Sequence, residues 1–106
     1  MKPVTKSSGN VFEDLKLVNS KELLVRAELA RQVYLIIKKR GLTQIAAANL
    51  LGLKQPDVSL LMRGRLSRFS TDRLIELLNT LNRDVDIVIK PNPSSKRKGT
   101  VKVIAA

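Results

Sequence analysis

The sequence predicts a mainly α-helical fold, a bundle of four to five helices that ends in a short β-strand or hairpin. Between residues 19 and 82, apolar side chains recur at the 3.6-residue period of a helix. Glycines and capping residues divide this region into separate helical stretches. After residue 82 the apolar period changes to two, which is typical of a half-buried strand.

The composition indicates one small domain without a cofactor. Of the 106 residues, 43% are hydrophobic, which is enough for one modest core. The sequence contains no Cys and no His, so disulfides, thiolate chemistry, the commonest general base and the commonest metal ligand are all missing. We therefore expect no enzyme activity, no metal and no cofactor. We divide the chain into a partly disordered arm (1–18), a helical domain (19–82) and a C-terminal β segment with a basic loop (83–106).

The charge indicates a polyanionic partner. The 20 Lys and Arg residues outnumber the nine Asp and Glu residues, and the resulting net charge of +11 favours nucleic acid. An acidic lipid surface or an acidic protein fits the charge as well, but no apolar run approaches the ~20 residues of a membrane helix. One Tyr and two Phe are too few to stack unpaired bases, so duplex DNA is favoured over single strands. Because no secretory signal is present, we expect a cytoplasmic location.

The N-terminal residues give weak signals. Residues 1–9 are polar and show no period that would bury one face, so disorder is expected there. Asn10 followed by Glu13 can cap one short helical turn. A turn of that length needs tertiary packing to persist, so we interpret residues 11–18 as a docking arm.

Residues 21–40 are predicted to form the longest helix. Asn19 and Glu22 make a capping box before it, and Gly41 supplies a left-handed stop after it. Two apolar faces run along this helix. The first consists of Leu23, Ala27, Ala30, Tyr34 and Ile37, and the second consists of Val25, Leu29, Val33 and Ile36. Because two faces need two partners, the helix is either central to the domain or presents one face to a second subunit.

Two short helices then flank a tight turn. The first begins at Thr43 and ends at Gly52, and the second begins at Lys54 or Gln55 and ends at Gly64. The residues that would pack the two helices against each other and against the core are Ala47, Ala48, Leu51, Val58 and Leu61. The opposite face of the second helix is polar, so this pair has the form of a helix-turn-helix.

The last helix is defined by four leucines. Ser70 or Thr71 is its N-cap, and Asn82 is its stop. The leucines recur at positions i, i+3, i+4 and i+7 and are Leu74, Leu77, Leu78 and Leu81. Their spacing predicts one continuous apolar stripe that faces the core.

The C-terminal segment alternates between apolar and polar residues. Val85, Ile87 and Ile89 make one predicted strand, and Val101 and Val103 repeat the alternation. The connection between them contains two prolines and the run Lys96, Arg97 and Lys98, and it is too long for a tight hairpin. The strands are therefore expected to pair as a loose hairpin within one chain or as a ladder between two chains.

Several stretches resemble known regulators. The stretch TQIAAANLLGLKQPDVS (residues 43–59) resembles the helix-turn-helix of XRE-type, lambda-repressor-like regulators. Three further phrases, SSGNVFEDL (7–15), RGRLSRFS (63–70) and NRDVDIVI (82–89), look like the HigA-like antitoxin subgroup of these regulators.

This resemblance implies a sequence-specific repressor that binds a palindromic operator on double-stranded DNA as a homodimer. It also implies the antitoxin of a type II toxin-antitoxin module, with a RelE/HigB-like RNase toxin as a partner that would contact either the arm up to Val18 or the C-terminal strands. Alternatives are a stand-alone phage-type regulator, a module whose main task is to occlude a toxin, and a nonspecific nucleic-acid chaperone.

In such a unit the second helix enters the major groove and presents its N-terminal side chains to base edges. The candidate base-contacting residues are Lys54, Gln55, Pro56, Asp57 and Ser59. The amide of Gln55 matches the N7 and N6 groups of adenine, and Lys54 reaches either a guanine or a phosphate. Asp57 either accepts from cytosine N4 or stabilises the helix N-terminus, and Pro56 fits the role of helix starter better than that of a thymine contact.

The candidate phosphate contacts lie on either side of this helix. They are Thr43, Gln44, Arg63, Arg65 and Arg68. Thr43 and Gln44 begin the preceding helix, whose N-terminus attracts anions, although ordinary capping explains them too. The three arginines follow the second helix closely and would straddle the DNA backbone, unless they are simply a solvated run of charge.

Overall fold

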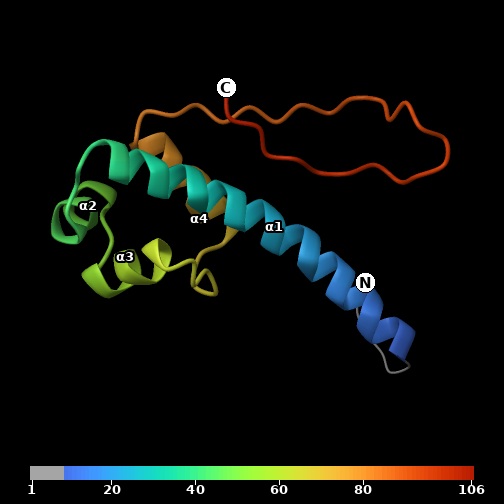
Figure 1. The fold of residues 1–106 in the computed structure, drawn as a ribbon, viewed down its shortest axis with the longest axis horizontal. Coiled ribbons are helices and arrows are strands. Elements are labelled where there is room, and N and C mark those ends of the chain that lie inside the picture. Colours follow the sequence, from blue (N-terminus) through green and yellow to red (C-terminus); the bar gives the residue numbers. More distant parts are fainter. Residues whose placement is uncertain (1–8) are drawn as a thin grey trace.

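The computed structural model of the protein describes residues 9–106, with side chains described from residue 21 onward. This part of the chain contains four helices and no strand. The helices are α1 (Gly9–Lys39), α2 (Gln44–Leu51), α3 (Gln55–Met62) and α4 (Thr71–Thr80). The predicted mainly α-helical fold is thus confirmed. None of the helices described has the length and apolar content needed to cross a bilayer. Figure 1 shows α2 and α3 on one side of the long helix α1.

Helix α1 begins earlier than predicted. It runs without a break from Gly9 through Asn19, so the capping box at Asn19 and Glu22 does not mark a helix start. No Pro or Gly lies between Asn10 and Arg40, and an Asn inside a helix costs at most about 0.7 kcal/mol relative to Ala. Disorder was expected for residues 1–9; residues 1–8 lie outside the part of the chain that the structure describes, and Gly9 is the first residue of α1.

The C-terminal end of α1 is formed as predicted. Gly41 adopts a left-handed φ of 65°, and the Leu42 N–H donates to the carbonyl of Ile37 over 3.1 Å. Lys38 and Lys39 lie in the last turn, where positive charge complements the helix dipole. The chain therefore reverses sharply into α2.

The core lies where α1 crosses the three shorter helices. Its largest fully buried side chains are Phe69, Ile37, Leu74, Leu81, Val33 and Val58. The most extensive helix contact is between α1 and α4, and α2 packs mainly on α3. The four leucines of the predicted α4 stripe are all buried, Ser70 caps this helix by accepting from the Arg73 N–H at 3.1 Å, and Asn82 ends it with a φ of 63°.

The two predicted apolar faces of α1 are buried to different extents. On the second face Leu29, Val33 and Ile36 are buried and Val25 is half-buried against the core. On the first face Ala30 and Ile37 are buried, whereas Leu23, at 51% exposure, and Ala27 are exposed, so these two are not core residues. Leu23 belongs to the N-terminal half of α1, which extends beyond the helices that cover its other half (Figure 1). Ala27 follows Val25 and Arg26, which do contact the bundle, so Ala27 is exposed because it lies on the uncovered side of the helix.

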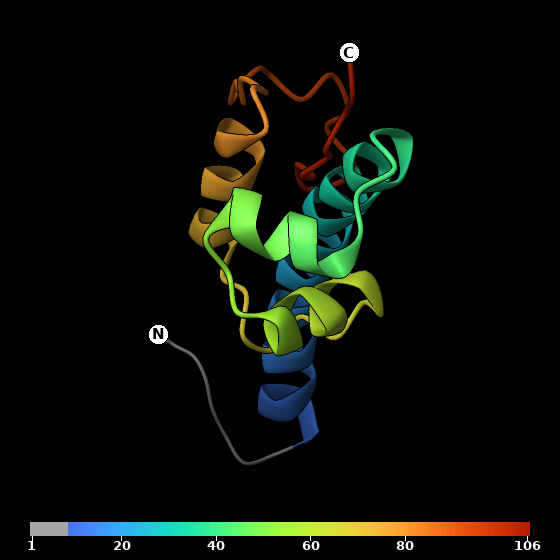
Figure 2. The same ribbon diagram turned by 90° about the vertical axis from the view of Figure 1, so that its left-hand side faces the viewer.

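The C-terminal segment does not form the predicted strands within the chain. Residues 83–106 run outward and return as extended coil, on the side of α1 that faces away from α3 (Figures 1 and 2). Val85 and Val103 are half-buried against the core. No backbone–backbone hydrogen bond is made by residues 84–106, all of which the structure describes. A strand needs a paired edge, and the long connection through Pro91 and Pro93 does not hold the two stretches in register.

Candidate nucleic-acid interface

The turn between α2 and α3 is sharp and well defined. Thr43 caps α2, with its Oγ1 accepting from the Ala46 N–H at 3.1 Å. Gly52 ends α2 with a left-handed φ of 67°, and the Leu53 N–H donates to the carbonyl of Ala48 at 3.0 Å. Nothing lies within 4 Å of the position a β-carbon would take on Gly52, so the backbone conformation and not the available space calls for glycine.

Small and branched side chains hold the two helices together. From α2, Ala47, Ala48 and Leu51 are buried, and from α3, Val58 and Leu61 are buried. The two alanines permit the close approach of the helices that a larger residue would prevent. The helix pair is therefore a rigid unit, with one side of α3 anchored in the core.

The other side of α3 faces away from the core. Lys54, Gln55 and Pro56 are exposed at the start of the helix, and Asp57 and Ser59 are half-buried. Lys54 is the N-cap residue but makes no side-chain cap, and Pro56 occupies the first turn, where its missing N–H leaves no intrahelical bond unmade. The five predicted base-contacting residues thus lie within the first turns of one helix, and three of them are exposed.

Asp57 and Arg68 form an ion pair. Arg68 Nη1 donates to Asp57 Oδ1 over 3.0 Å, and the Asp57 side chain is 13% exposed while that of Arg68 is 65% exposed. From the sequence, Asp57 was predicted to contact a base and Arg68 was predicted to contact a phosphate. Their pairing neutralises the only carboxylate of α3 and links the loop after α3 to its first turn.

The remaining candidate phosphate contacts lie at the start of α2 and just after the end of α3. Arg63 and Arg65 are exposed, as are Thr43 and Gln44 at the start of α2. Arg63 Nε donates to the carbonyl of Ser59 at 3.4 Å, whereas Arg65 makes no side-chain hydrogen bond or ion pair to any residue that the structure describes. The structure therefore exposes positive charge just after the C-terminal end of α3.

Comparison with known proteins identifies the family. A family model described as a helix-turn-helix domain matches residues 11–90. A solved structure described as a putative XRE family transcriptional regulator is 40% identical in sequence, with a TM-score of 0.79, and the match covers 83% of this chain and 99% of that one. This chain belongs to the XRE family of helix-turn-helix transcriptional regulators. No curated protein matches it at a significant level.

One arginine of this XRE regulator, which holds the loop after α3, was not predicted from the sequence. Arg26 of α1 donates through Nη1 to the carbonyls of Leu66 and Phe69, at 3.4 Å each, and through Nη2 to Glu22 Oε1 at 2.9 Å. Its side chain is largely buried, and its Nε is buried without a hydrogen-bond partner in the described residues. Arg26 thereby fastens the loop that carries Arg65 and Arg68. The available signal was a charged residue next to the buried face of an apolar helix, which is rare unless the charge is paired.

A second arginine supports the same loop from α4. The guanidinium of Arg73 lies 5.3 Å from the centroid of the Phe69 ring, and its Nη1 donates to the carbonyl of Arg68 at 3.5 Å. Phe69 itself is fully buried, so the contact fixes the loop to the core.

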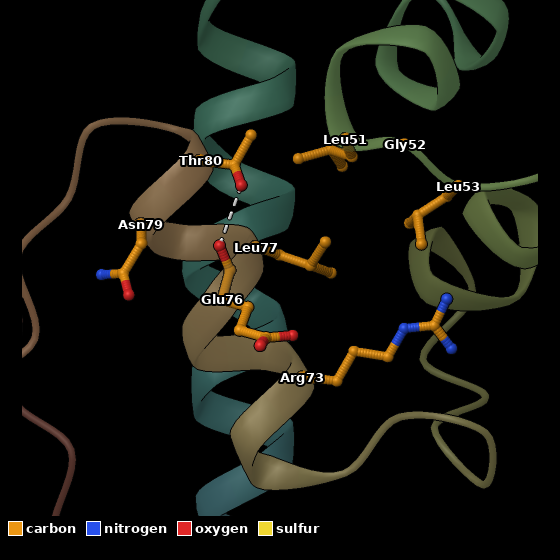
Figure 3. A pocket seen from close by; sticks show the side chains of 8 residues that line it. All are labelled: Leu51, Gly52, Leu53, Arg73, Glu76, Leu77, Asn79 and Thr80. Carbon is orange, nitrogen blue, oxygen red and sulfur yellow. Dashed lines mark hydrogen bonds between the residues drawn. The ribbon is translucent and has the colours of Figure 1, made fainter.

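In Figure 3 the Arg73 side chain extends from α4 toward Leu53 across an open groove. The groove lies between the helix-turn-helix turn and α4 and is lined by Leu51, Gly52, Leu53, Arg73, Glu76, Leu77, Asn79 and Thr80.

Proposed function

We propose that this XRE regulator is a cytoplasmic, sequence-specific repressor that binds a palindromic DNA operator as a homodimer. The observation that carries the proposal is the placement of α3, whose apolar side is held by buried Val58 and Leu61 while its polar N-terminal end is open. A helix presented in this way fits the major groove, which is about 12 Å wide.

Within this proposal, the first residues of α3 read the base pairs. Gln55 is exposed and offers both a donor and an acceptor to adenine, and Lys54 beside it reaches a guanine or the neighbouring phosphate. Ser59 lies one turn further along the same side, and Pro56 begins the helix and contributes at most an apolar contact. Asp57 remains a candidate base contact through its second carboxylate oxygen, since the first is bound to Arg68.

The proposed phosphate contacts lie at the start of α2 and in the stretch that follows the C-terminal end of α3. Thr43 and Gln44 place the N-terminus of α2 against one strand, and Arg63, Arg65 and Arg68 place positive charge against the other. Each phosphate neutralised by a Lys or Arg adds about 0.9 to the slope of log affinity against log salt concentration. Strong salt dependence is therefore part of the proposal.

Titration against two kinds of duplex tests this function. Selection from a randomised duplex pool supplies the preferred sequence, and fluorescence anisotropy at about 0.15 M salt compares it with an unrelated duplex, because specific binding is typically at least about a thousandfold tighter. A preferred sequence that is palindromic and is bound at least about a thousandfold more tightly than the unrelated duplex supports a dimeric repressor. Equal affinity for all duplexes would instead identify a nonspecific nucleic-acid binder.

A second function, antitoxin activity, rests on the resemblance to HigA-like regulators and on α1. Leu23 and Leu24 are 51% and 68% exposed on the part of α1 that extends beyond the bundle, and apolar side chains exposed in this way favour a protein partner. We propose a RelE/HigB-like toxin as that partner. Co-purification with the product of the adjacent gene, and rescue of growth when that product is toxic, support the antitoxin. If the product of the adjacent gene is not toxic and does not bind this protein, the protein is a stand-alone regulator.

A further inference from the structure

The C-terminal segment carries three consecutive apolar side chains that are largely exposed. Ile87, Val88 and Ile89 are 79%, 77% and 93% exposed, although they follow directly on the half-buried Val85. The backbone here is extended but makes no backbone–backbone hydrogen bond. An extended apolar stretch with unpaired N–H and C=O groups is a template for pairing with another strand.

The sequence of this stretch is complementary to itself. If residues 84–90 of two copies run antiparallel with Ile87 opposite Ile87, then Val85 lies opposite Ile89 of the second copy. Directly opposed β-branched side chains of this kind stabilise antiparallel pairs. The three apolar residues at positions 85, 87 and 89 then share one face of the ladder in both copies.

The charged residues at the two ends of this stretch favour the same register. With Ile87 on the two-fold axis, Asp84 lies opposite Lys90 of the second copy, and the symmetry repeats this pair. Neither Asp84 nor Lys90 forms an ion pair with any residue that the structure describes, and both are exposed. Opposite charges placed directly across a ladder are favourable. Pro91, which lacks an N–H, follows the last paired residue and ends the strand.

An intramolecular hairpin fits the charges less well. Aligning the two half-buried valines, Val85 and Val103, would place Lys90 opposite Lys98, and like charges directly opposed are destabilising. The two-fold register has no such conflict.

We propose that residues 84–90 of two copies of this chain pair as an antiparallel β-ladder centred on Ile87. This inference rests on the proposed function in one respect, because it supplies the dimer that a palindromic operator needs. The ladder would form on the side of α1 that faces away from α3, so it leaves the recognition helix of each copy open (Figures 1 and 2).

Cross-linking tests the register directly, because the protein has no cysteine of its own. The variant Ile87→Cys places two thiols opposite each other at the two-fold axis, within the reach of a disulfide. Ile104→Cys is the matched control, since Ile104 is 78% exposed, lies in the same segment and is outside the ladder. Under mild oxidation at micromolar concentration, the first variant should become a covalent dimer and the second should stay mostly monomeric. Equal cross-linking of the two variants would overturn the proposal.

Charge exchange gives a second, independent readout. Asp84→Lys and Lys90→Asp each place like charges opposite each other, so each should weaken self-association by about threefold or more, as sedimentation velocity measures it. A mixture of the two variants restores both opposite-charge pairs and should form a heterodimer. A mixture that associates no better than the separate variants would contradict the register. If operator binding persists in that case, the strand proposal alone fails and the repressor function stands.

Discussion

Arg68 lies 3.0 Å from Asp57, and this ion pair connects the loop after α3 to the first turn of the same helix. The pair has two consequences. It neutralises the only acidic side chain of α3, which would reduce the repulsion between this carboxylate and the phosphates of the DNA we propose it binds, and it places an exposed guanidinium at the end of the helix that we propose contacts bases. Because the Arg68 side chain is 65% exposed, the pair itself contributes little to folding stability, at most about 1 kcal/mol.

Replacing Asp57 by Asn should raise the affinity for DNA. The amide that Asp57→Asn introduces keeps an oxygen that accepts from Arg68, and it removes a negative charge near the phosphates. We expect binding to the preferred duplex and to an unrelated duplex to tighten together by about threefold at about 0.15 M salt, as fluorescence anisotropy measures it.

The same variant separates the two roles of Asp57. If its carboxylate accepts from cytosine N4, affinity for the preferred duplex falls at one base pair while affinity for unrelated duplexes does not. Asp72→Asn is the control, because Asp72 is exposed in the first turn of α4 and forms no ion pair among the described residues.

Replacing Arg26 by Ala should both destabilise the protein and weaken DNA binding. The change removes the donors that satisfy the carbonyls of Leu66 and Phe69, and it frees the loop that carries Arg65 and Arg68. We expect the free energy of unfolding to fall by about 2 kcal/mol, measured by urea denaturation. Arg31→Ala is the matched control on the same helix, because its contact with Glu28 is 3.8 Å long and exposed; it should change stability by less than about 0.5 kcal/mol. Equal losses in the two variants would show that Arg26 does not anchor the loop.

Much of the helical bundle could be predicted because its signals are local. The cap at Thr43, the left-handed Gly41 and Gly52, and the cap at Ser70 all act within about four residues of the helix ends that they define. The leucine spacing of α4 likewise depends only on the helical period. The placement of these elements around one core followed from their apolar faces.

The N-terminal half of α1 could not be predicted from the same signals. Asn19 and Glu22 match a capping box, but both residues are also tolerated inside a helix. The motif therefore permits a helix to begin at Asn19 but does not require it. Nor does the pattern of apolar faces show where a helix extends beyond the elements that cover it, or how wide its covered side is. Leu23 and Ala27 were therefore wrongly assigned to the core.

Contacts between distant residues were also out of reach. Arg26 and the carbonyl of Phe69 are 43 residues apart, and Asp57 and Arg68 are 11 apart across a loop, so no helical or strand period relates them. The absence of strands in residues 83–106 has a related reason, since a strand is stable only when an edge is available to pair with it and the single chain offers none. The alternating pattern at Val85, Ile87 and Ile89 indicates that this stretch can form a strand. It does not indicate which other strand it would pair with.

Replacing Gln55 by Ala should relax sequence preference at one base pair of each half-site. The variant loses the bidentate contact proposed for adenine, and discrimination there should fall by about 1–3 kcal/mol. Gln44→Ala is the matched control, because Gln44 is also exposed but lies at the start of α2, where we propose a phosphate contact. It should weaken all duplexes alike. Binding to a panel of single-base operator variants measures both effects, and an unchanged preference in Gln55→Ala would refute its assignment.

Replacing Arg65 by Ala should reduce the salt dependence of binding. The loss of one phosphate contact lowers the slope of log affinity against log salt concentration by about 0.9, with little change in sequence preference. Lys96→Ala removes an equal charge from the C-terminal segment, on the side of α1 away from α3, and should leave the slope nearly unchanged. If the two variants changed the slope equally, Arg65 would be acting through net charge alone.

Amide chemical-shift mapping of the labelled protein during titration with its preferred duplex tests the position of α3 most directly. We expect the largest shifts at the start of α2, along the first turns of α3 and in the loop through Arg68. Residues 91–99, on the other side of α1, should change little. Large shifts confined to that C-terminal loop, with α3 unaffected, would contradict the account.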